Sequence, residues 1–320
     1  MRRFLPLFLI SSLAFAACDK KAEDKKDDKK EEAKKDDKKG DDKGDKKGDK
    51  DDDKKGDKKE DGLVFKAKAP AVGDKVEEKE TSEMKMALDI DAGGKKQTVD
   101  MTMNESMVKK TEVLAVDGKA VTKEKVTYVE KKKTETEGGK EKKKPKSPID
   151  GKTYILEAKD GKTLVTDEKG KKVPKDEEEA VLKANRAFGK PDPVLTGLPD
   201  KAIKVGDKVE KLAKALEEHF KDMDESKEQP EISDVEVKLE SIDKDGEAGV
   251  FTIQLTMSSP KSSKEPFSMK IPLKGTMKVR AKDGFTTEVN LKGPLTMEGT
   301  DPKFKLSAKG DMKLSITNTQ

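Results

Sequence analysis

The chain has 320 residues, of which 43% are charged and 4% aromatic, and it contains no tryptophan. This composition excludes a single packed core over the whole length, because too few large apolar side chains are present to offset the ordering of so many charged residues. The net charge of +4 shows no concentrated basic excess, which argues against a nucleic-acid-binding protein. Cys18 is the only cysteine, so an intrachain disulfide is excluded.

Residues 1–17 have the pattern of an export signal. Arg2 and Arg3 form a positive start, an apolar stretch follows over residues 4–14, and small residues precede Cys18. A bilayer-spanning helix needs about 20 apolar residues, so this stretch is too short to be one. A buried core segment is the alternative, but the very polar residues that follow offer nothing to cover it. We expect a signal peptide over residues 1–17.

The residues Leu13-Ala14-Phe15-Ala16-Ala17-Cys18 resemble a bacterial lipobox, with Phe15 at the usual leucine position. The resemblance implies cleavage before Cys18, a diacylglycerol on its sulfur and a chain anchored to the membrane through that lipid. Two or three acyl chains are enough for stable anchoring. An ordinary secretory signal beside a coincidental cysteine is the alternative.

The resemblance further implies export to the cell envelope. Asp19 resembles the residue that retains lipoproteins in the inner membrane of enteric bacteria. Other lineages use other rules, so the periplasmic face of either membrane and the cell surface all remain open.

Residues 18–62 are expected to form a charged tether. The segment 19–61 contains 18 lysines and 19 acidic residues, and its apolar side chains are no larger than alanine. Such a segment cannot bury enough surface to pack, so it is disordered or partly helical. As a coil it would span on the order of 35–40 Å, which suits a spacer. A tail that binds a charged partner is the alternative, although the alternating signs cancel the long-range field it would need.

After residue 62 the pattern changes to strands separated by turns, which predicts a β-rich domain over residues 63–320. Apolar residues alternate with polar ones at Met84 to Ile90 and again at Val99 to Met103, and a further strand ends near Val116. The second half repeats this pattern from Val235 to Ile316, with turns such as Asp245-Gly246. Two helices are expected in the middle, over residues 176–188 and 208–223, with a proline-rich segment between them.

These elements predict a mainly β fold. Consecutive hairpins indicate antiparallel meander sheets, either a curved half-barrel or an open barrel, with one or two short helices in the middle. The hexapeptide Val72-Gly73-Asp74-Lys75-Val76-Glu77 recurs over residues 205–210. The repeat suggests that the halves 63–190 and 191–320 are duplicated, although chance identity in a chain so rich in lysine and aspartate is the alternative.

The segment Leu198-Pro199 followed by Val205-Gly206-Asp207 resembles an entry motif in a family of uncharacterised bacterial envelope domains. The resemblance covers about residues 63–320, but this chain lacks the tryptophan that the family has after that aspartate. No activity is implied by it. In architecture alone the domain is similar to the lipoprotein-carrier half-barrels that hold acyl chains.

The sequence offers little for catalysis, and we expect no enzyme. His219 is the only histidine, which excludes a metal site with two histidine ligands, and we expect it to be a partly exposed helix residue. Neither a Gly-x-Ser-x-Gly elbow nor a Walker-type phosphate loop is present. No cofactor or metal is expected, and the oligomeric state is left open.

The inward strand positions are rich in methionine and aliphatic residues. They are candidates to line a site for a lipid or another hydrophobic ligand, since methionine adapts to irregular apolar shapes. The set comprises Met84, Met86, Met101, Met103, Met269, Ile271, Val289 and Leu291. Core filling is the alternative. The basic segment 131–146 is either a solvated hairpin tip or a contact for anionic headgroups. The sequence thus favours a binding or structural domain, with a lipid carrier or sensor as one form of it.

Overall fold

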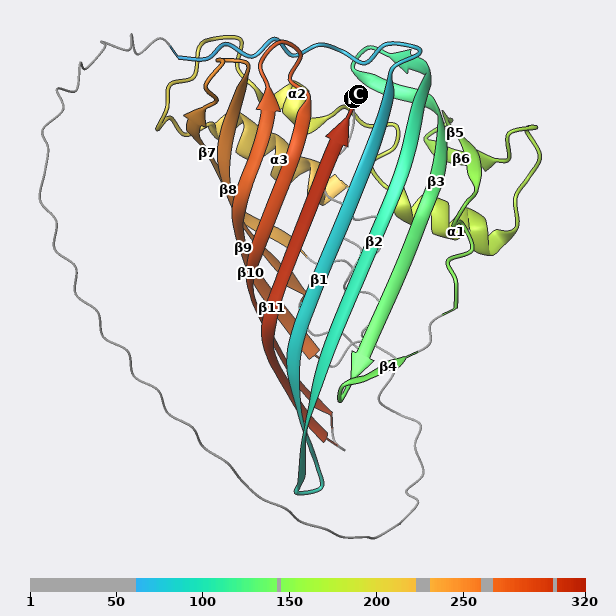
Figure 1. Cartoon of the computed structure of the whole chain (residues 1–320), viewed down its shortest axis with the longest axis vertical. Helices are drawn as coiled ribbons and strands as arrows, with labels where there is room; N and C mark the ends of the chain where they lie inside the picture. Colours follow the sequence, from blue (N-terminus) through green and yellow to red (C-terminus); the bar gives the residue numbers. More distant parts are fainter. Residues whose placement is uncertain (1–61, 143–144, 223–230, 260–266, 302–303) are drawn as a thin grey trace, which may run out of the picture. The chain divides into compact units, whose positions relative to one another are not determined.

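The computed structural model describes residues 62–142, 145–222, 231–259, 267–301 and 304–320. The expected signal peptide, Cys18 and almost all of the expected tether lie outside the described residues. The described strands form one antiparallel sheet of 11 strands, in the order β6-β5-β3-β2-β1-β11-β10-β9-β8-β7, and β4 pairs with β3 (Figure 1). The expected fold class is confirmed: it is mainly β, built from meanders, and the sheet is open.

The first half of the chain supplies six strands, which are β1 (Lys75–Ala92), β2 (Lys95–Asp117), β3 (Ala120–Glu137), β4 (Lys140–Lys142), β5 (Thr153–Lys159) and β6 (Lys162–Thr166). The expectation of two strands between Val99 and Val116 is wrong, because β2 runs unbroken for 23 residues. Its middle contains polar inward residues, which interrupt the apolar pattern without interrupting the hydrogen bonds to β1.

The second half supplies five strands, which are β7 (Glu231–Ile242), β8 (Ala248–Ser259), β9 (Phe267–Arg280), β10 (Thr286–Asp301) and β11 (Phe304–Thr319). Each pairs with the next in the chain. The last strand, β11, pairs along its length with the first, β1, for example at Met84 and Met312. This one pairing joins the two meanders at the centre of the sheet.

Three helices lie between the meanders: α1 (Lys175–Ala184), α2 (Pro193–Gly197) and α3 (Glu210–Asp222). The sequence predicted α1 and α3 but not α2. Asp192 caps α2 by accepting a hydrogen bond from the Val194 backbone N–H at 2.7 Å, and Pro193 occupies its first turn. An aspartate followed by a proline is a known start signal for a helix, so this short helix could have been found.

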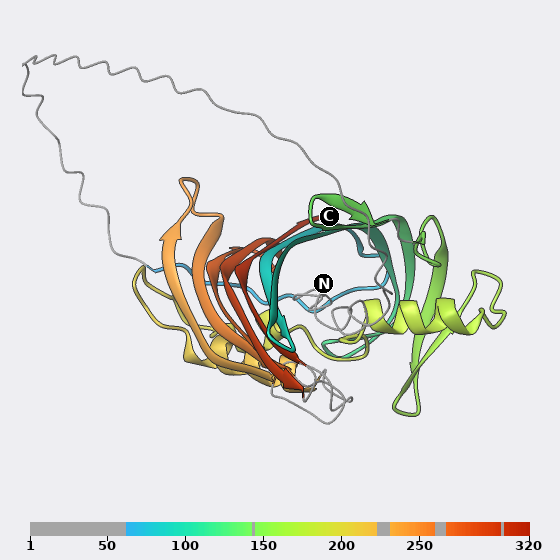
Figure 2. The same ribbon diagram turned by 90° about the horizontal axis from the view of Figure 1, so that it is seen from below.

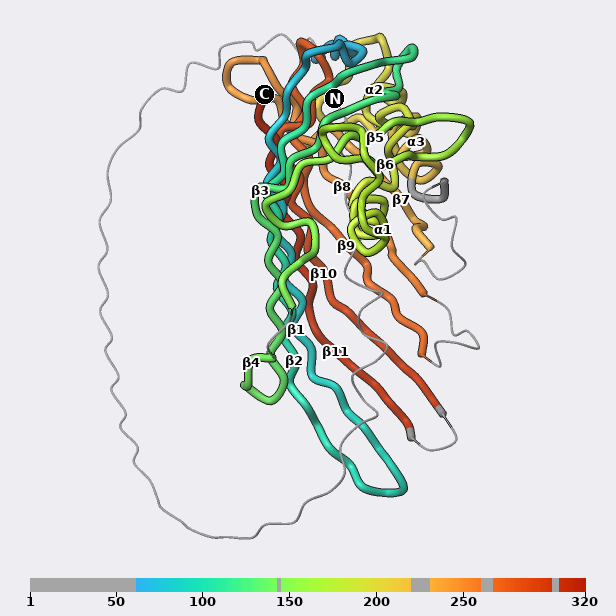
Figure 3. The backbone as a smooth tube through the Cα atoms, turned by 90° about the vertical axis from the view of Figure 1, so that its right-hand side faces the viewer, coloured from blue at the N-terminus to red at the C-terminus, as the bar shows by residue number. Residues whose placement is uncertain are grey.

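All three helices lie on one face of the sheet, which we call the inner face. They gather near the end where β1 begins, and the strands continue well beyond them toward the β1–β2 turn (Figures 1 and 3). The sheet is curved, with the helices on its concave side (Figure 2).

Three inward glycines, Gly275, Gly293 and Gly310, permit this curvature. A side-chain carbon at Gly275 would overlap the carbonyl oxygen of Asn290 on β10. One at Gly293 would overlap the carbonyl oxygen of Pro272 on β9. Glycine is the residue that lets two strand backbones approach this closely at a bend.

The repeated hexapeptide forms the same turn in both places. The Gly73 N–H donates to the Val113 carbonyl at 2.9 Å, and the Gly206 N–H donates to the Leu239 carbonyl at 2.8 Å. Both glycines have a positive φ, 89° and 97°. The first copy opens β1, whereas the second leads into α3. Duplication of the halves stays a prediction.

Candidate functional site

The eight residues predicted to line an apolar site all lie on the inner face and are buried, none exposing more than 9% of its surface. Cross-strand pairing brings several of them together. Met84 pairs with Met103 on one side and Met312 on the other, and Met86 pairs with Met101. Directly paired residues lie on the same face, so Met103, Met84 and Met312 form a row across three strands, and Met101 and Met86 form the row beside it.

Further apolar pairs lie on the inner face of the second meander. Met269 pairs with Met297, Val289 pairs with Met277, and Leu291 pairs with Leu314. Ten methionines are buried in the described residues, which are Met84, Met86, Met101, Met103, Met107, Met257, Met269, Met277, Met297 and Met312. Unbranched, polarisable side chains in this number form a surface that can repack around apolar groups of varied shape.

The described helices cover one end of this face. Leu195 of α2 packs with Val76 and Phe285 near the start of β1. Val181 and Ala184 of α1 pack into the cluster around the first half of β3. The part of the sheet near the β1–β2 turn lies beyond all three helices (Figure 3).

Helix α1 is fixed to the sheet by polar contacts from two tyrosines. The Tyr154 hydroxyl donates to Glu177 at 2.6 Å, and the Tyr128 hydroxyl accepts from the Asn185 amide at 2.5 Å. Lys152 also pairs with Glu177, at 2.6 Å. Burial and the neighbouring carboxylate raise the pKa of Tyr154, so its hydroxyl keeps its proton and remains a donor.

Charged side chains also face inward, which the sequence reading missed. Glu78 and Lys109 are almost fully buried and form an ion pair, with 2.7 Å between the Lys109 Nζ and the Glu78 Oε1. A buried ion pair has a large desolvation cost and is weak support for stability, so core packing alone does not account for the Glu78–Lys109 pair. The signal was visible in β1, where the alternation that contains Met84 and Met86 continues backward to Glu80 and Glu78.

Glu80 lies between Glu78 and Ser82 on the inward side of β1 and is 9% exposed. Burial raises the pKa of Glu80 to about 8, and repulsion from Glu78 adds to this, while Lys109 opposes it. The Glu80 carboxyl is therefore mostly protonated at neutral pH.

The polarity of the inner face changes from one side to the other. On the second half of β3 the inward residues paired with β2 are charged: Lys131 pairs with Met107, Lys133 with Glu105, and Glu135 with Met103. On the first half, Val126 and Tyr128 face inward and are fully buried. On the opposite side the inward positions are apolar, as at Leu291 and Met277. Beside the second half of β3, the inner face is thus amphipathic in the direction across the strands.

A cavity of about 560 Å³ opens beside the charged side, between β3, the loop after β4, and α1. We call it the basic pocket. Its lining has five lysines and two carboxylates, and comprises Glu105, Lys131, Lys132, Lys133, Thr134, Pro145, Lys146, Ser147, Asp150, Ala180 and Lys183. The Lys131 ammonium lies 3.5 Å from Glu105, and the Lys146 ammonium lies 3.0 Å from Asp150.

The lysines of this pocket influence one another. Desolvation lowers the pKa of Lys183, and the like charges of Arg186, Lys133 and Lys131 lower it further, with Glu105 acting in the opposite direction. Mutual repulsion of this kind means that a bound anion would relieve an existing electrostatic cost.

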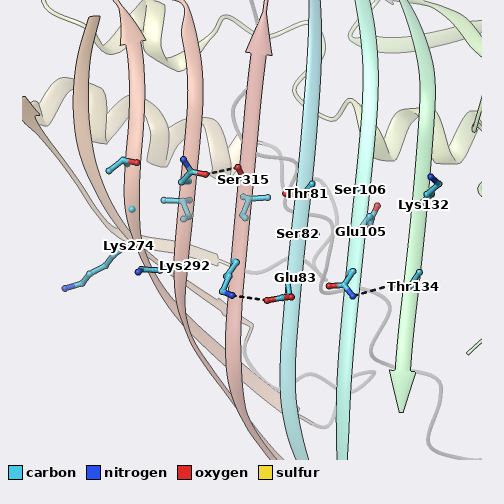
Figure 4. A pocket seen from close by; sticks show the side chains of 17 residues that line it. Thr81, Ser82, Glu83, Glu105, Ser106, Lys132, Thr134, Lys274, Lys292 and Ser315 are labelled. Carbon is cyan, nitrogen blue, oxygen red and sulfur yellow. Dashed lines mark hydrogen bonds and ion pairs between the residues drawn. The ribbon is translucent and has the colours of Figure 1, made fainter. Parts of the chain in front are cut away.

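A larger groove, of about 830 Å³, crosses the opposite, outer face of the sheet (Figure 4). Its polar side chains bond to one another across strands. Lys313 pairs with Glu83 at 3.1 Å, and Ser315 donates to Asn290 at 2.7 Å. Cross-strand pairs of this kind are typical of a solvated sheet face, so we place the candidate site on the inner face.

The expectation that His219 is partly exposed is wrong, because only 8% of it is accessible. It lies on the helical face of Leu212 and Leu216, which turns inward. Within the described ranges, no cluster of three or more metal-ligating side chains occurs. None of the described helices is long and apolar enough to cross a membrane.

No protein family model and no curated protein match the chain. Among solved structures, one of lipovitellin, which concerns its lipid–protein interactions, is similar to this chain. The two share 7% identity and a TM-score of 0.34, and the match covers 76% of this chain. The chain spans only 25% of that protein. A DUF1329 family protein from Desulfovibrio piger has 7% identity and a TM-score of 0.12, covering 75% of this chain and 84% of that one.

The translocator domain of the autotransporter NalP from Neisseria meningitidis has 8% identity and a TM-score of 0.16, covering 77% of this chain and 88% of that one. Similarities at this level assign neither a fold family nor a function to the chain.

Proposed function

We propose that the β-rich domain binds the apolar part of an amphiphile, such as a lipid, against the inner face, and that it does so without catalysis. The observation that carries the proposal is the composition of the inner face, which holds methionine-rich rows on β1, β2 and β11 and inward charges at Glu78, Lys109 and the second half of β3. A purely structural core has no need of charged residues such as Glu78 and Lys109 inside it. An amphiphile needs both kinds of surface.

We also propose where in the cell the domain lies. The lipobox-like residues before Cys18 and the charged segment 19–61 suit an exported lipoprotein, held to the membrane by a lipid on Cys18 and spaced from it by a tether. A domain in that position would meet its ligand at the membrane surface.

The proposal is tested with the mature chain, residues 18–320, carrying Cys18→Ser so that no lipid is attached. Native mass spectrometry should show a non-covalently bound lipid or should show uptake of an added one. Met101→Asp places a charge on the inner face and should abolish this binding, because an unpaired charge is strongly disfavoured against an apolar chain.

Two further variants make this result interpretable. Asn104→Asp adds a charge on the outer face of the same strand and should leave binding unchanged. Met101→Leu keeps the face apolar and should keep the ligand. Failure of the parent chain to bind any lipid, or full binding by a folded Met101→Asp variant, would contradict the proposal.

A further inference from the structure

The basic pocket lies at the edge of the inner face, and Lys132 and Thr134 line both this pocket and the outer groove. It lies at the edge of the sheet on the charged side, where the loop residue Asp150 accepts a hydrogen bond from the Lys131 backbone N–H at 2.7 Å. The loop thereby holds Lys146 over β3, while α1 brings Lys183 from the other side. Three separate elements thus direct lysines into one cavity.

The charge balance of the pocket favours an anion. Five lysines and two carboxylates line the cavity of about 560 Å³, and one of these lysines, Lys132, is paired with Glu130 at 2.7 Å. Arg186 adds to the positive potential that Lys183 experiences. The two carboxylates already pair with Lys131 and Lys146. Lysine is a common ligand for phosphate groups, and ionic hydrogen bonds to phosphate are among the stronger polar contacts in proteins.

Strand pairing also connects lysines of the pocket to apolar residues of the inner face. Lys133 pairs with Glu105 on β2, and Glu105 pairs with Ser82 on β1, which in turn pairs with Leu314 on β11. The neighbouring row runs from Glu135 through Met103 and Met84. A molecule lying across the strands would therefore have one end at the lysines and the other on methionines and leucines.

From this arrangement we infer that the basic pocket binds the anionic, phosphate-type headgroup of the amphiphile whose apolar chain lies on the inner face. The inference rests on the proposed function and specifies its ligand class. Lys133 and Lys183 are the residues assigned to the headgroup, since they approach the cavity from the sheet and from α1.

Three probes separate the headgroup from the chain: dodecyl phosphate, dodecyl maltoside and inorganic phosphate, with the dodecyl compounds used below their micelle concentrations. Isothermal titration of the mature Cys18→Ser chain should give binding of dodecyl phosphate roughly tenfold or more tighter than of dodecyl maltoside, as expected for a few charge-assisted hydrogen bonds. Inorganic phosphate should bind more weakly than dodecyl phosphate.

The double variant Lys133→Gln/Lys183→Gln should remove the preference for dodecyl phosphate and keep the affinity for dodecyl maltoside. The control Lys274→Gln/Lys292→Gln, which removes two exposed lysines from the outer face, should keep the preference. Lys133→Arg/Lys183→Arg retains the charges and should retain it too, which shows that the pocket is still folded.

The outcomes distinguish this inference from the proposed function. Equal affinity of the parent chain for both dodecyl compounds, or a preference that survives the double glutamine variant, overturns the headgroup site while the apolar binding stands. No binding of either dodecyl compound overturns the proposed function. If inorganic phosphate then binds through the same lysines, the pocket is a site for a free anion and the headgroup inference is overturned as well.

Discussion

At the scale of single residues, the protonation of Glu80 makes the free energy of unfolding depend on pH. Its pKa in the folded chain, about 8, lies above the ordinary value of 4.5 because of burial and repulsion from Glu78. The folded state therefore holds this proton more tightly than the unfolded chain does. Between pH 4.5 and about 8 the unfolded chain has lost the proton and the folded chain keeps it, so the contribution of Glu80 to the free energy of unfolding decreases as the pH rises through that window.

The variant Glu80→Gln should remove this dependence, because glutamine has a similar shape and never ionises. At pH 9 we expect its free energy of unfolding to exceed that of the parent chain by on the order of 2–4 kcal/mol, and at pH 4 the two should be nearly equal. Urea denaturation at the two pH values measures the difference.

Glu83 provides the control, because it faces outward and its ion pairs with Lys313 and Lys85 lower its pKa. Its contribution to stability is lost as the pH falls, which is the opposite sign. A Glu80→Gln chain that is less stable than its parent at pH 9 would show that the carboxylate is stabilised by its surroundings and that the assigned direction is wrong.

At the scale of elements, the strands were largely predictable and the interior charges were not. Period-two alternation located the apolar inward positions correctly, including Met101 and Met269, because a half-buried strand must place one face in the core. The same rule interprets polar residues at inward positions as the end of a strand. For that reason the sequence predicts two strands where the structure has the single strand β2. For the basic segment 131–146 the sequence allows either a solvated hairpin tip or a contact for anionic headgroups, and only the pairing of β3 with β2 shows that Lys131 and Lys133 face inward.

The curvature of the sheet could not be predicted from the alternation of apolar and polar residues. Curvature depends on where the backbones of two neighbouring strands approach closely. In the sequence, the glycines on β9, β10 and β11 look the same as glycines that form turns. We expect Gly275→Ala to lower the free energy of unfolding by roughly 2–4 kcal/mol, because the new carbon overlaps the Asn290 carbonyl and the strand must shift.

Chemical denaturation measures this loss, and Thr276→Ala, at the exposed neighbouring position, should change the free energy of unfolding by less than about 1 kcal/mol. Equal stability of Gly275→Ala and the parent chain would mean that the bend does not depend on this close approach.

At the scale of the whole molecule, the proposed lipid anchor on Cys18 would hold the domain at a membrane. Cys18→Ser should prevent acylation and leave unprocessed precursor in cells, because the modified sulfur is required before cleavage in lipobox-type signals. Mass spectrometry of the intact chain and partition between detergent and water report the two effects. Ser12→Ala, a change in the same segment that keeps the cysteine, should be processed normally. A Cys18→Ser chain that is cleaved and still partitions into detergent would rule out the anchor.

The pairing of β1 with β11 also governs how the sheet can assemble. Each meander is made of neighbours in sequence and can form from local hairpins, whereas contacts across the central seam join residues such as Glu83 and Lys313, which are 230 positions apart. Closing so long a loop is slow relative to hairpin formation. The seam is therefore expected to form last, after β11 has been synthesised, and until then both central strands expose unpaired edges. The period before the seam closes is when the chain is most exposed to aggregation.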